Sequence, residues 1–392
     1  MSSFIDMLRL PEAQLDGALY TAREIFQQPQ LWDKVLDLLD KQAGDADEFL
    51  KRAGMSGRGD ATVLLCGAGS SDFVGKSIAP VLRQGLRREV IPVATTRVVT
   101  NPSSVFIPGR PYAVVHFARS GDSPESIAAY RLLRSERPDV AHLVVTCNSE
   151  GALAREAAVD PNAFLFLLPP EANDRSLAMT SSFTGMALCG VGLSRLHRLA
   201  ALRASMAPVR RAADRIMVEY ADSISQFAAA GFTKACYLGS HALEGAMEEG
   251  ALKMLEMTAG AVTAVSNSFL GIRHGPRVFI DSACAIVACL ASDAGVRRYE
   301  IDLLRNLRDS GQGRGLLAIS AGEDPVAREI VDQLIVLAPA GEAIPDELRV
   351  FTDIIACQLL AFFASRARGL APDSPSPSGV ISRVVQGVTI YD

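Results

Sequence analysis

The sequence repeats itself internally, and this repeat constrains the fold more than any other feature. Gly67 and Gly239 each follow an apolar run, and Ser120 and Ser292 each follow another. The two glycines are as far apart along the chain as the two serines, and we call this shared separation the repeat spacing. The tripeptide Ala-Arg-Glu at 154–156 recurs at 327–329, which departs from the repeat spacing by a single position. Segments that recur in one order at nearly one spacing indicate a unit that was duplicated within the chain.

Each half of the sequence alternates short apolar runs with helical patterns. We interpret the runs as β-strands, at 62–66, 90–95, 113–118, 142–147 and 164–168 in the first half and 235–238, 285–290, 316–319 and 334–337 in the second. Strands that are apolar on both faces are typical of parallel sheets with helices on either side. The sequence therefore predicts an α/β protein with two tandem doubly wound parallel-sheet domains.

The segments outside the repeat set the predicted domain boundaries. Residues 1–53 are expected to form an N-terminal helical arm, with a break at Gln28-Pro29. The first domain then covers 54–205 and the second covers 206–371. The tail at 372–392 begins as a Pro- and Ser-rich linker, but its later part regains a strand-like alternation. We therefore expect an ordered tail that is attached to the protein rather than free.

Composition and charge exclude several classes of protein. Of the 392 residues 49% are hydrophobic, and the formal net charge is −5, which argues against a nucleic-acid partner. Seven cysteines lie scattered without a Cys-x-x-Cys pair, as expected of free thiols in a reducing compartment. The longest charge-free window, 176–194, contains several Ser, Thr and Gly residues, so we interpret it as a buried helix. We predict a soluble cytoplasmic protein with no membrane partner.

The segment 241–260 combines helix-forming residues with a group of ionisable side chains. Glu249, Lys253 and Glu256 stand at i, i+4 and i+7, so they share one helix face. Apolar residues spread around the rest, which predicts a mostly buried helix. His274 follows in a loop rich in glycine and proline. Spacing alone favours an ordinary surface ion pair with a loop histidine, but the same residues could perform acid/base catalysis.

Two strand-to-helix turns in the first half are rich in glycine and hydroxyl groups. The hydroxyl groups belong to Ser70 and Ser71 in the first turn and to Ser120, Ser123 and Ser126 in the second. Open α/β sheets bind ligands at the carboxyl ends of their strands, where backbone N–H groups and hydroxyls can hold a phosphate. The alternative is that these residues only cap helices. The corresponding turns of the second half lack this combination of glycine and hydroxyl groups. If only the first half binds phosphate, the second half can supply the catalytic residues.

The motifs of nucleotide cofactors are incomplete in this sequence. The dinucleotide fingerprint has Gly67 and Gly69, but the next glycine comes only at Gly75. Gly75-Lys76-Ser77 lacks the earlier glycine that a Walker A motif requires. No metal-ligand spacing stands out either. We therefore predict no cofactor and no metal.

Taken together, these segments resemble the sugar isomerase (SIS) family over nearly the whole chain. The resemblance is closest to the branch of tagatose-6-phosphate ketose/aldose isomerases, also described as galactosamine-6-phosphate deaminases. The isomerase domain of glucosamine-6-phosphate synthase is similar more distantly. The segments that carry the resemblance are GAGSSDFVG (67–75), FARSGDSPES (117–126), EEGALKMLEMTAG (248–260), GIRHGPRVFID (271–281) and PSPSGVISRVVQGVTIYD (375–392).

The resemblance implies an enzyme that acts on a hexose or hexosamine 6-phosphate, galactosamine 6-phosphate above all. His274 would open the sugar ring, and Glu256 would move a proton between C2 and C1 through an enolamine or enediol. Lys253 would stabilise the developing oxyanion, and Glu249 would orient Lys253. The family also implies that the histidine loop comes from a neighbouring subunit of a homodimer or a larger homo-oligomer.

The sequence departs from the synthase pattern at two positions that bear on the ligand. Arg119 replaces a glutamine at the phosphate turn, and we expect it to bind phosphate or to favour a different sugar epimer. The tail lacks the synthase lysine, so Arg383 is its only basic residue and a candidate for closing over the ligand. The alternative function is a non-catalytic sugar-phosphate sensor, which would need only the phosphate-binding turns.

Overall fold

The chain divides into two compact units, each built on one β-sheet. The computed structural model describes residues 3–10, 17–376, 378–385 and 387–391. The first-sheet unit comprises Gln30–Asp174, Met179–Arg203 and Gly379–Asp392, and the second-sheet unit comprises Met1–Pro29, Arg175–Ala178 and Ala204–Ser378. The predicted arm and the predicted tail are thus each divided between the two units. The division into an arm, two domains and a tail stays a prediction.

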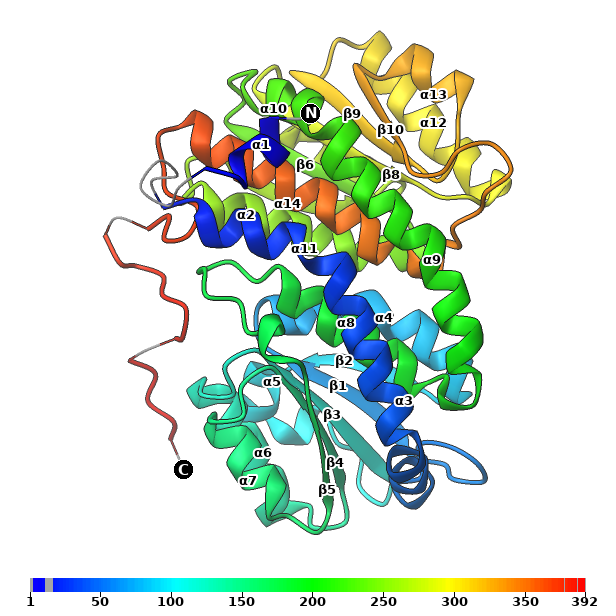
Figure 1. Ribbon diagram of the computed structural model, residues 1–392, viewed down its shortest axis with the longest axis vertical. Helices are drawn as coiled ribbons and strands as arrows, with labels where there is room; N and C mark the ends of the chain where they lie inside the picture. Colours follow the sequence, from blue (N-terminus) through cyan, green and yellow to red (C-terminus); the bar gives the residue numbers. More distant parts are fainter. Residues whose placement is uncertain (1–2, 11–16, 377, 386, 392) are drawn as a thin grey trace. The chain divides into compact units, whose positions relative to one another are not determined.

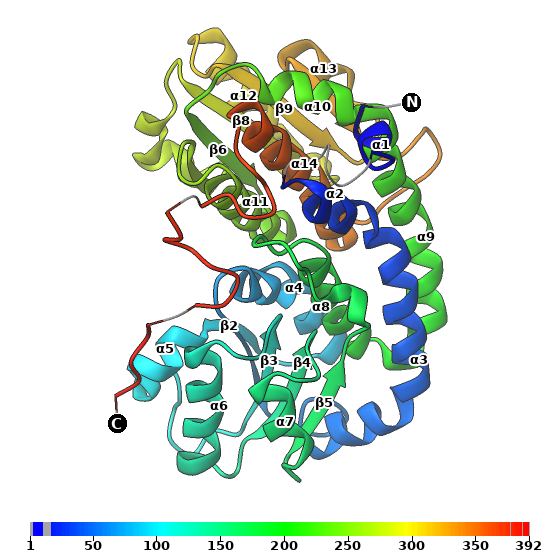
Figure 2. The ribbon, with the colours of Figure 1, turned by 60° about the vertical axis from the view of Figure 1, so that its left-hand side comes forward.

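The first-sheet unit contains five parallel strands in the order β2-β1-β3-β4-β5. The strands are β1 (Thr62–Gly67), β2 (Val90–Ala94), β3 (Tyr112–Ala118), β4 (Ala141–Thr146) and β5 (Ala163–Leu167). The helices are α3 (Gln28–Arg52), α4 (Ser70–Leu86), α5 (Thr95–Thr100), α6 (Pro124–Glu136), α7 (Ala152–Ala158) and α8 (Ser181–Leu193). They lie on both faces of the sheet, as Figure 1 and Figure 2 show.

Alternate residues of each strand face opposite helices in this unit. Leu64 of β1 and Val114 of β3 pack with Leu133 of α6 in one buried cluster. On the other face, glycines allow a close approach: a Cβ at Gly75 of α4 would lie 3.0 Å from Leu65. The sheet is therefore doubly wound, as the sequence predicts.

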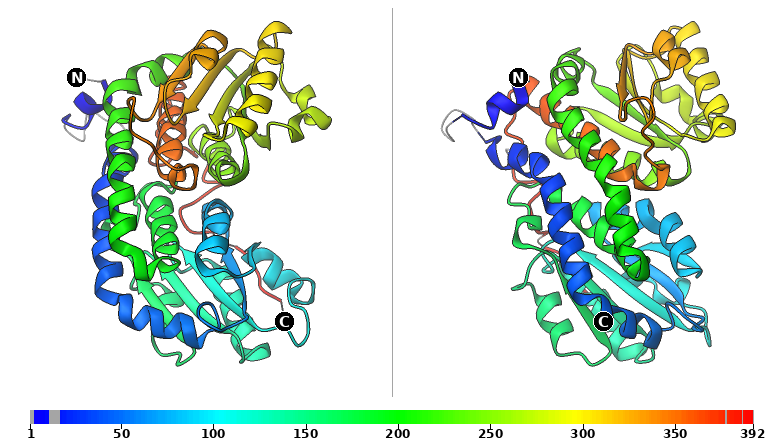
Figure 3. Two further views of the ribbon diagram at one scale, coloured as in Figure 1. Left: turned by 90° about the vertical axis from the view of Figure 1, so that its right-hand side faces the viewer. Right: turned by 45° about the vertical axis from the view of Figure 1, so that its right-hand side comes forward.

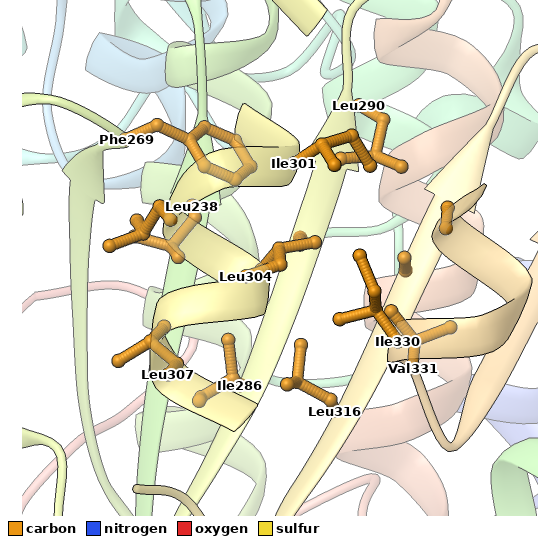
Figure 4. Close-up of a cluster of buried hydrophobic side chains, with 14 of the residues drawn as sticks. Leu238, Phe269, Ile286, Leu290, Ile301, Leu304, Leu307, Leu316, Ile330 and Val331 are labelled. Carbon is orange, nitrogen blue, oxygen red and sulfur yellow. The ribbon is translucent and has the colours of Figure 1, made fainter. Parts of the chain in front are cut away.

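The second-sheet unit repeats this arrangement with strands in the order β10-β9-β8-β6-β7. The strands are β6 (Lys234–Gly239), β7 (Thr263–Ser268), β8 (Cys284–Leu290), β9 (Gly315–Ser320) and β10 (Gln333–Val336). The helices are α1 (Ser3–Met7), α2 (Leu19–Phe26), α10 (Ala221–Ala228), α11 (Glu244–Met257), α12 (Ala294–Asp309), α13 (Pro325–Ile330) and α14 (Val350–Ala367). In Figure 4, apolar residues of α12 lie over β8, with Ile301 and Leu304 near Leu290 and Ile286.

Helix α9 (Leu199–Arg215) carries the chain from one unit to the other. It begins beside α3, where Arg203 forms ion pairs with Asp37 and Asp40 at 2.8 and 2.7 Å (Figure 3). A π-helical turn at Ile216–Tyr220 follows before α10.

The pairing register confirms the duplication. Cys66 of β1 pairs with His116 of β3, and Leu238 of β6 pairs with Ala288 of β8. Each residue of the second pair follows its counterpart in the first pair at the repeat spacing that the sequence shows. With β6, β7, β8, β9 and β10 matched to β1 to β5, the two sheets have the same strand order.

Two features differ from the sequence prediction. β7 was not predicted, because Thr-Ala-Val-Ser-Asn-Ser is too polar to stand out as an apolar run. β7 is an edge strand of its sheet, so its side chains need not all be apolar. The strand-like alternation at the end of the chain was misleading, since the described tail residues between 378 and 391 form no strand. An alternating segment becomes a strand only where a neighbouring strand is available to pair with it.

Apolar helices and cysteines are mostly buried. Val350–Ala367 is long and apolar enough to cross a membrane, with a mean hydropathy of 1.4, but 89% of it is buried inside the protein. It packs against α10 and α11, so we describe α14 as a core helix. The charge-free window at 176–194 contains α8, whose residues are all buried. All seven cysteines are free and buried.

Candidate functional site

The strand order of each sheet contains one point where ligands are expected to bind. In the first sheet the chain passes from β1 to β2 on one side and then to β3 on the other. The turns after β1 and β3 therefore lie at the carboxyl ends of adjacent strands, at a topological switch point. These are the two hydroxyl-rich turns. In the second sheet, the turns after β6 and β8 occupy the corresponding switch point.

The turn after β1 needs glycine for steric reasons. A Cβ at Gly67 would lie 2.3 Å from the backbone of Ser71, so a side chain there would push α4 away from the strand. Gly69 has a φ of 57° and precedes the first residue of α4, Ser70. Ser70 and Ser71 are both buried, 4% and 5% exposed. The N-terminus of α4 thus points at the switch point with two hydroxyl groups in its first turn.

The turn after β3 is shaped by contacts with the turn after β4. Gly121 has a φ of 69°, and a Cβ at Gly151 would lie 2.4 Å from the carbonyl oxygen of Ser120. The Oγ of Ser120 accepts a hydrogen bond from the Asp122 N–H at 3.2 Å, and its carbonyl accepts one from Asn148 at 2.8 Å. Within the described residues no carboxylate accepts a bond from the Ser120 N–H. This N–H can therefore bind an anionic ligand.

The other predicted phosphate residues lie beside this turn. Ser123 precedes the first residue of α6 without capping it through its side chain, and Ser126 lies buried in the first turn of α6. Arg119 is 7% exposed, and its Nη2 donates to the carbonyl oxygen of Arg383 at 2.6 Å. A buried guanidinium therefore lies at the end of β3 and contacts the C-terminal tail.

Arg383 attaches the C-terminal tail to the rest of the first-sheet unit. The tail runs past α5 and α6 (Figure 2). Its Nε donates to the carbonyl oxygen of Asp174 at 2.7 Å, and its Nη2 donates to the side chain of Asn173. Sequence analysis did not identify Asn173 or Asp174, because nothing local in the sequence indicates that residues 209 positions apart meet. The side chain of Arg383 thus holds the tail in place.

In the second-sheet unit, Glu249, Lys253 and Glu256 come together on α11 as predicted. Lys253 Nζ lies 3.3 Å from Glu249 Oε1, and it also donates to Glu256 Oε2. The side chains of Lys253 and Glu249 are 0% exposed, whereas that of Glu256 is 23% exposed. The plainer interpretation of a surface ion pair is therefore wrong. These residues form a buried ionic group with one member that reaches solvent.

Burial and charge act in opposite directions on Lys253. Burial alone lowers the pKa of its ammonium group, but the charges of Glu249 and Glu256 outweigh burial and leave that pKa raised. Lys253 is therefore a permanent cation between two carboxylates at neutral pH. A fixed buried cation suits the stabilisation of an oxyanion better than proton exchange.

His274 lies at the end of a short 3₁₀ helix, Gly271–His274, and is exposed. It forms no hydrogen bond or ion pair with Glu256 among the described residues. Its loop is held by arginines: Arg273 pairs with Asp302 at 2.8 Å, and Arg277 Nε donates to Gln312 at 2.8 Å. His274 is thus presented outward on a firmly attached loop.

The described residues contain no group of three or more His, Cys, Asp or Glu side chains that could hold a metal ion. The predicted site residues fall into two sets. The hydroxyl-rich turns, Arg119 and Arg383 belong to the first-sheet unit, whereas the ionic group of α11 and His274 belong to the second.

Two parallel doubly wound sheets of the same strand order are the fold of the sugar isomerase (SIS) class of proteins. A similar solved structure, from Clostridium novyi NT, is assigned as a tagatose-6-phosphate ketose/aldose isomerase. It has a TM-score of 0.92 and 34% sequence identity, with 99% of this chain and 97% of that chain covered. No protein-family model matches the chain.

Curated relatives agree with this class over nearly their full length. A Streptomyces coelicolor protein assigned as D-galactosamine-6-phosphate deaminase AgaS is 39% identical, covering 96% of each chain. D-galactosamine-6-phosphate deaminase AgaS of Escherichia coli is 37% identical, covering 97% of each. The chain belongs to this AgaS family of SIS-fold sugar-phosphate isomerases and deaminases.

Proposed function

We propose that this enzyme converts galactosamine 6-phosphate into tagatose 6-phosphate and ammonia. The relatives named for D-galactosamine-6-phosphate deaminase and the structure named for the ketose/aldose isomerase support this assignment. The observation that carries it is the buried ionic group of α11, in which only Glu256 is partly exposed. A protein that only sensed sugar phosphates would have no need to bury Lys253 between two carboxylates, which is costly.

The turns after β1 and β3 bind the phosphate group. Backbone N–H groups at the start of α4 and α6 provide donors, and the hydroxyls of Ser70, Ser71, Ser120, Ser123 and Ser126 add further ones. Arg119 contributes a positive charge that the chain as a whole, at −5, does not supply. Arg383 keeps the C-terminal tail against Arg119 and so closes one side of this site.

The reaction starts with opening of the pyranose ring. The imidazole of His274 moves a proton between the anomeric hydroxyl and the ring oxygen, which gives the open-chain aldehyde. The carboxylate of Glu256 then removes the proton from C2, and the charge that develops on the C1 oxygen is stabilised by the fixed cation of Lys253. Return of that proton to C1, with transfer of one amine proton to the C1 oxygen, gives the 2-imine. Water then adds to C2 and the nitrogen leaves as ammonia, which gives the 2-ketose.

His274 is proposed to act in the active site of a second copy of the chain. Its exposure, and the arginine contacts that hold its loop, support a role outside its own protomer. The nearby Val278 is 89% exposed, as expected of an apolar side chain that an interface would cover. We propose a homodimer that works in the cytoplasm.

The test is an assay of the purified enzyme with galactosamine 6-phosphate, glucosamine 6-phosphate and tagatose 6-phosphate, in which ammonia and ketose are measured. Glu256→Gln should abolish turnover, lowering kcat at least a hundredfold, while the thermal shift caused by the sugar phosphate is kept. Glu244→Gln makes the same change at an exposed position of the same helix and should leave kcat unchanged.

Two results would contradict the proposal. A ligand-induced thermal shift of the unmodified protein without turnover of any of the three substrates would indicate a sensor. Full activity of Glu256→Gln would show that another group transfers the proton. Mixing inactive Glu256→Gln with inactive His274→Asn should restore part of the activity if His274 acts across a dimer, because mixed dimers then contain one complete site.

A further inference from the structure

The second-sheet unit has a switch-point turn that matches the proposed phosphate turn, but its donors are already occupied. Ser292 follows β8 as Ser120 follows β3, and the two serines are separated by the repeat spacing. The Ser292 backbone N–H donates to Asp346 Oδ2 at 2.7 Å, and its hydroxyl donates to Asp346 Oδ1 at 2.7 Å. One carboxylate thus binds both donors, in the two-pronged way in which a phosphate would bind them.

Other carboxylates take further donors around this turn. The Ala291 N–H donates to Glu300 Oε2 at 2.8 Å, and Glu300 is fully buried. Asp293 caps α12 by accepting from the N–H groups of Gly295 and Val296 at 2.8 and 2.9 Å. The donors of Ala291 and Ser292, and those of the first turn of α12, are therefore bound by acidic acceptors from within the chain.

A buried cation lies behind Asp346. Arg349 is 0% exposed, and its Nη1 lies 3.3 Å from Asp346 Oδ1. The same guanidinium donates to the carbonyl oxygens of Leu290 and Ile319, which fixes it at the ends of β8 and β9. Arg349 also pairs with the buried carboxylate of Asp353, with its Nη2 2.8 Å from Asp353 Oδ2. Its charge is thus shared by two carboxylates, and it helps to hold the Asp346 carboxylate at this turn.

The corresponding aspartate of the first-sheet unit is used differently. Asp174 precedes Asp346 by the repeat spacing and lies between β5 and α8, just as Asp346 lies between β10 and α14. The carboxylate of Asp174 accepts from the Thr180 N–H at 2.8 Å and from the Ser182 N–H at 2.9 Å, so it caps α8. Among the described residues the carboxylate of Asp174 accepts no hydrogen bond from the Ser120 turn, whereas that of Asp346 accepts two from Ser292.

We infer that Asp346 is an internal substitute for phosphate, which closes a second oxyanion site and leaves one phosphate site in each chain. The ligand class of the closed site is a phosphate or phosphomonoester dianion. Because the Asp346 side chain is 26% exposed, the site can be reached from solvent once the carboxylate is removed. Removal would leave the two donors of Ser292 available to an external anion, beside an Arg349 that stays paired with Asp353.

The inference rests on the proposed function in one respect: it compares the Ser292 turn with the proposed phosphate turn at Ser120. Its test measures whether a variant gains a phosphate-binding site. Inorganic phosphate is titrated into the full-length protein by calorimetry. Asp346→Ala is expected to bind one more phosphate per chain than the unmodified protein. Phosphate should also raise the melting temperature of Asp346→Ala by more than it raises that of the unmodified protein. Glu323→Gln removes an equally charged, 59% exposed carboxylate and should change neither quantity.

Two further variants separate the possible explanations. Asp346→Ser keeps one hydrogen-bond acceptor for the turn and replaces Asp346→Ala in the test if that variant does not fold. It too should bind one more phosphate per chain than the unmodified protein. The double variant Ser120→Ala with Asp346→Ala should bind phosphate more weakly at the Ser120 turn but keep the new site at the Ser292 turn. A failure of the proposed phosphate turn can therefore be told apart from a failure of this inference. An unchanged phosphate stoichiometry and an unchanged thermal response in both Asp346 variants would overturn the inference.

Discussion

His116 on β3 and His142 on β4 form a buried pair that should make the protein sensitive to mild acid. His116 Nε2 lies 3.1 Å from His142 Nδ1, and the two side chains are 2% and 1% exposed. Burial lowers the pKa of His142 to about 4, an effect that the Asp160 carboxylate partly offsets and the Arg134 cation reinforces. Burial lowers the pKa of His116 well below its usual range, and the neighbouring His142 lowers it further.

The sign of the pH effect follows from which state binds the proton. Below pH 6.5 the unfolded chain protonates its histidines, while the folded protein keeps this pair neutral. Stability is therefore fully present above about pH 6.5 and is lost as the pH falls toward 4. With a pKa of about 4 in the folded state and 6.5 in the unfolded state, His142 alone lowers the free energy of unfolding by about 2 kcal/mol at pH 5. His116 adds to this loss.

The measurement compares urea unfolding at pH 7.5 and pH 5 for the unmodified protein and for His142→Asn. Asparagine can replace the bond to His116 but does not titrate, so the loss between the two pH values should shrink by about 2 kcal/mol. His197→Asn is the control, because His197 is 77% exposed and pairs only at the surface. The reasoning would be refuted if His142→Asn lost as much stability at pH 5 as the unmodified protein.

Contacts within single units lead to three further predictions. Lys253→Met removes the cation that pairs with the buried Glu249 and should lower the free energy of unfolding by about 3 to 5 kcal/mol in urea. Gly151→Ala places a Cβ 2.4 Å from the carbonyl oxygen of Ser120 in the proposed phosphate turn and should weaken phosphate binding at least tenfold by calorimetry. Arg383→Ala removes the contacts that hold the tail, so limited proteolysis should cut residues 379–391 faster, as mass spectrometry can measure.

Two of these predictions have a control variant, and all three have a result that contradicts them. Lys253→Arg keeps the charge and should cost clearly less than Lys253→Met; equal costs would mean that packing, not charge, matters there. Gly322→Ala is the control for Gly151→Ala, because a Cβ at Gly322 would have no other atom within 4 Å. It should change the free energy of unfolding by less than about 0.5 kcal/mol. Unaltered phosphate affinity in Gly151→Ala, or an unaltered cleavage rate in Arg383→Ala, would show that these contacts are not important.

The sequence predicts this fold well because its signal is local and repeated. Apart from β7, the strands of the described residues correspond to apolar runs, since a strand buried on both faces of a parallel sheet must be apolar throughout. β7 is an edge strand that can be polar, so it gave no such signal. The helix face of Glu249, Lys253 and Glu256 followed from the helical period alone, but its burial depends on α14, which comes much later in the chain.

Contacts made by tertiary structure are what the sequence could not predict. The attachment of Arg383 to Asn173 and the contact of Asp346 with Ser292 both join segments that are remote in the chain. A turn's residues indicate which donors it has, but not whether another part of the fold will supply the acceptor. The loss of glycine and hydroxyl groups from the second-half turns was visible in the sequence, yet the carboxylate that fills one of them was not.

Duplication alone would give two equivalent switch points, and the structure shows how they became different. At one, the Asp174 carboxylate caps α8, and among the described residues it accepts no bond from Ser120. At the other, the equivalent Asp346 binds Ser292 and is backed by Arg349. Under our proposal, the carboxylate at this position determines whether a turn binds an external anion or an internal one. Under the same proposal the second-sheet unit admits no ligand at its own switch point, which is compatible with the buried ionic group of Lys253 in that unit.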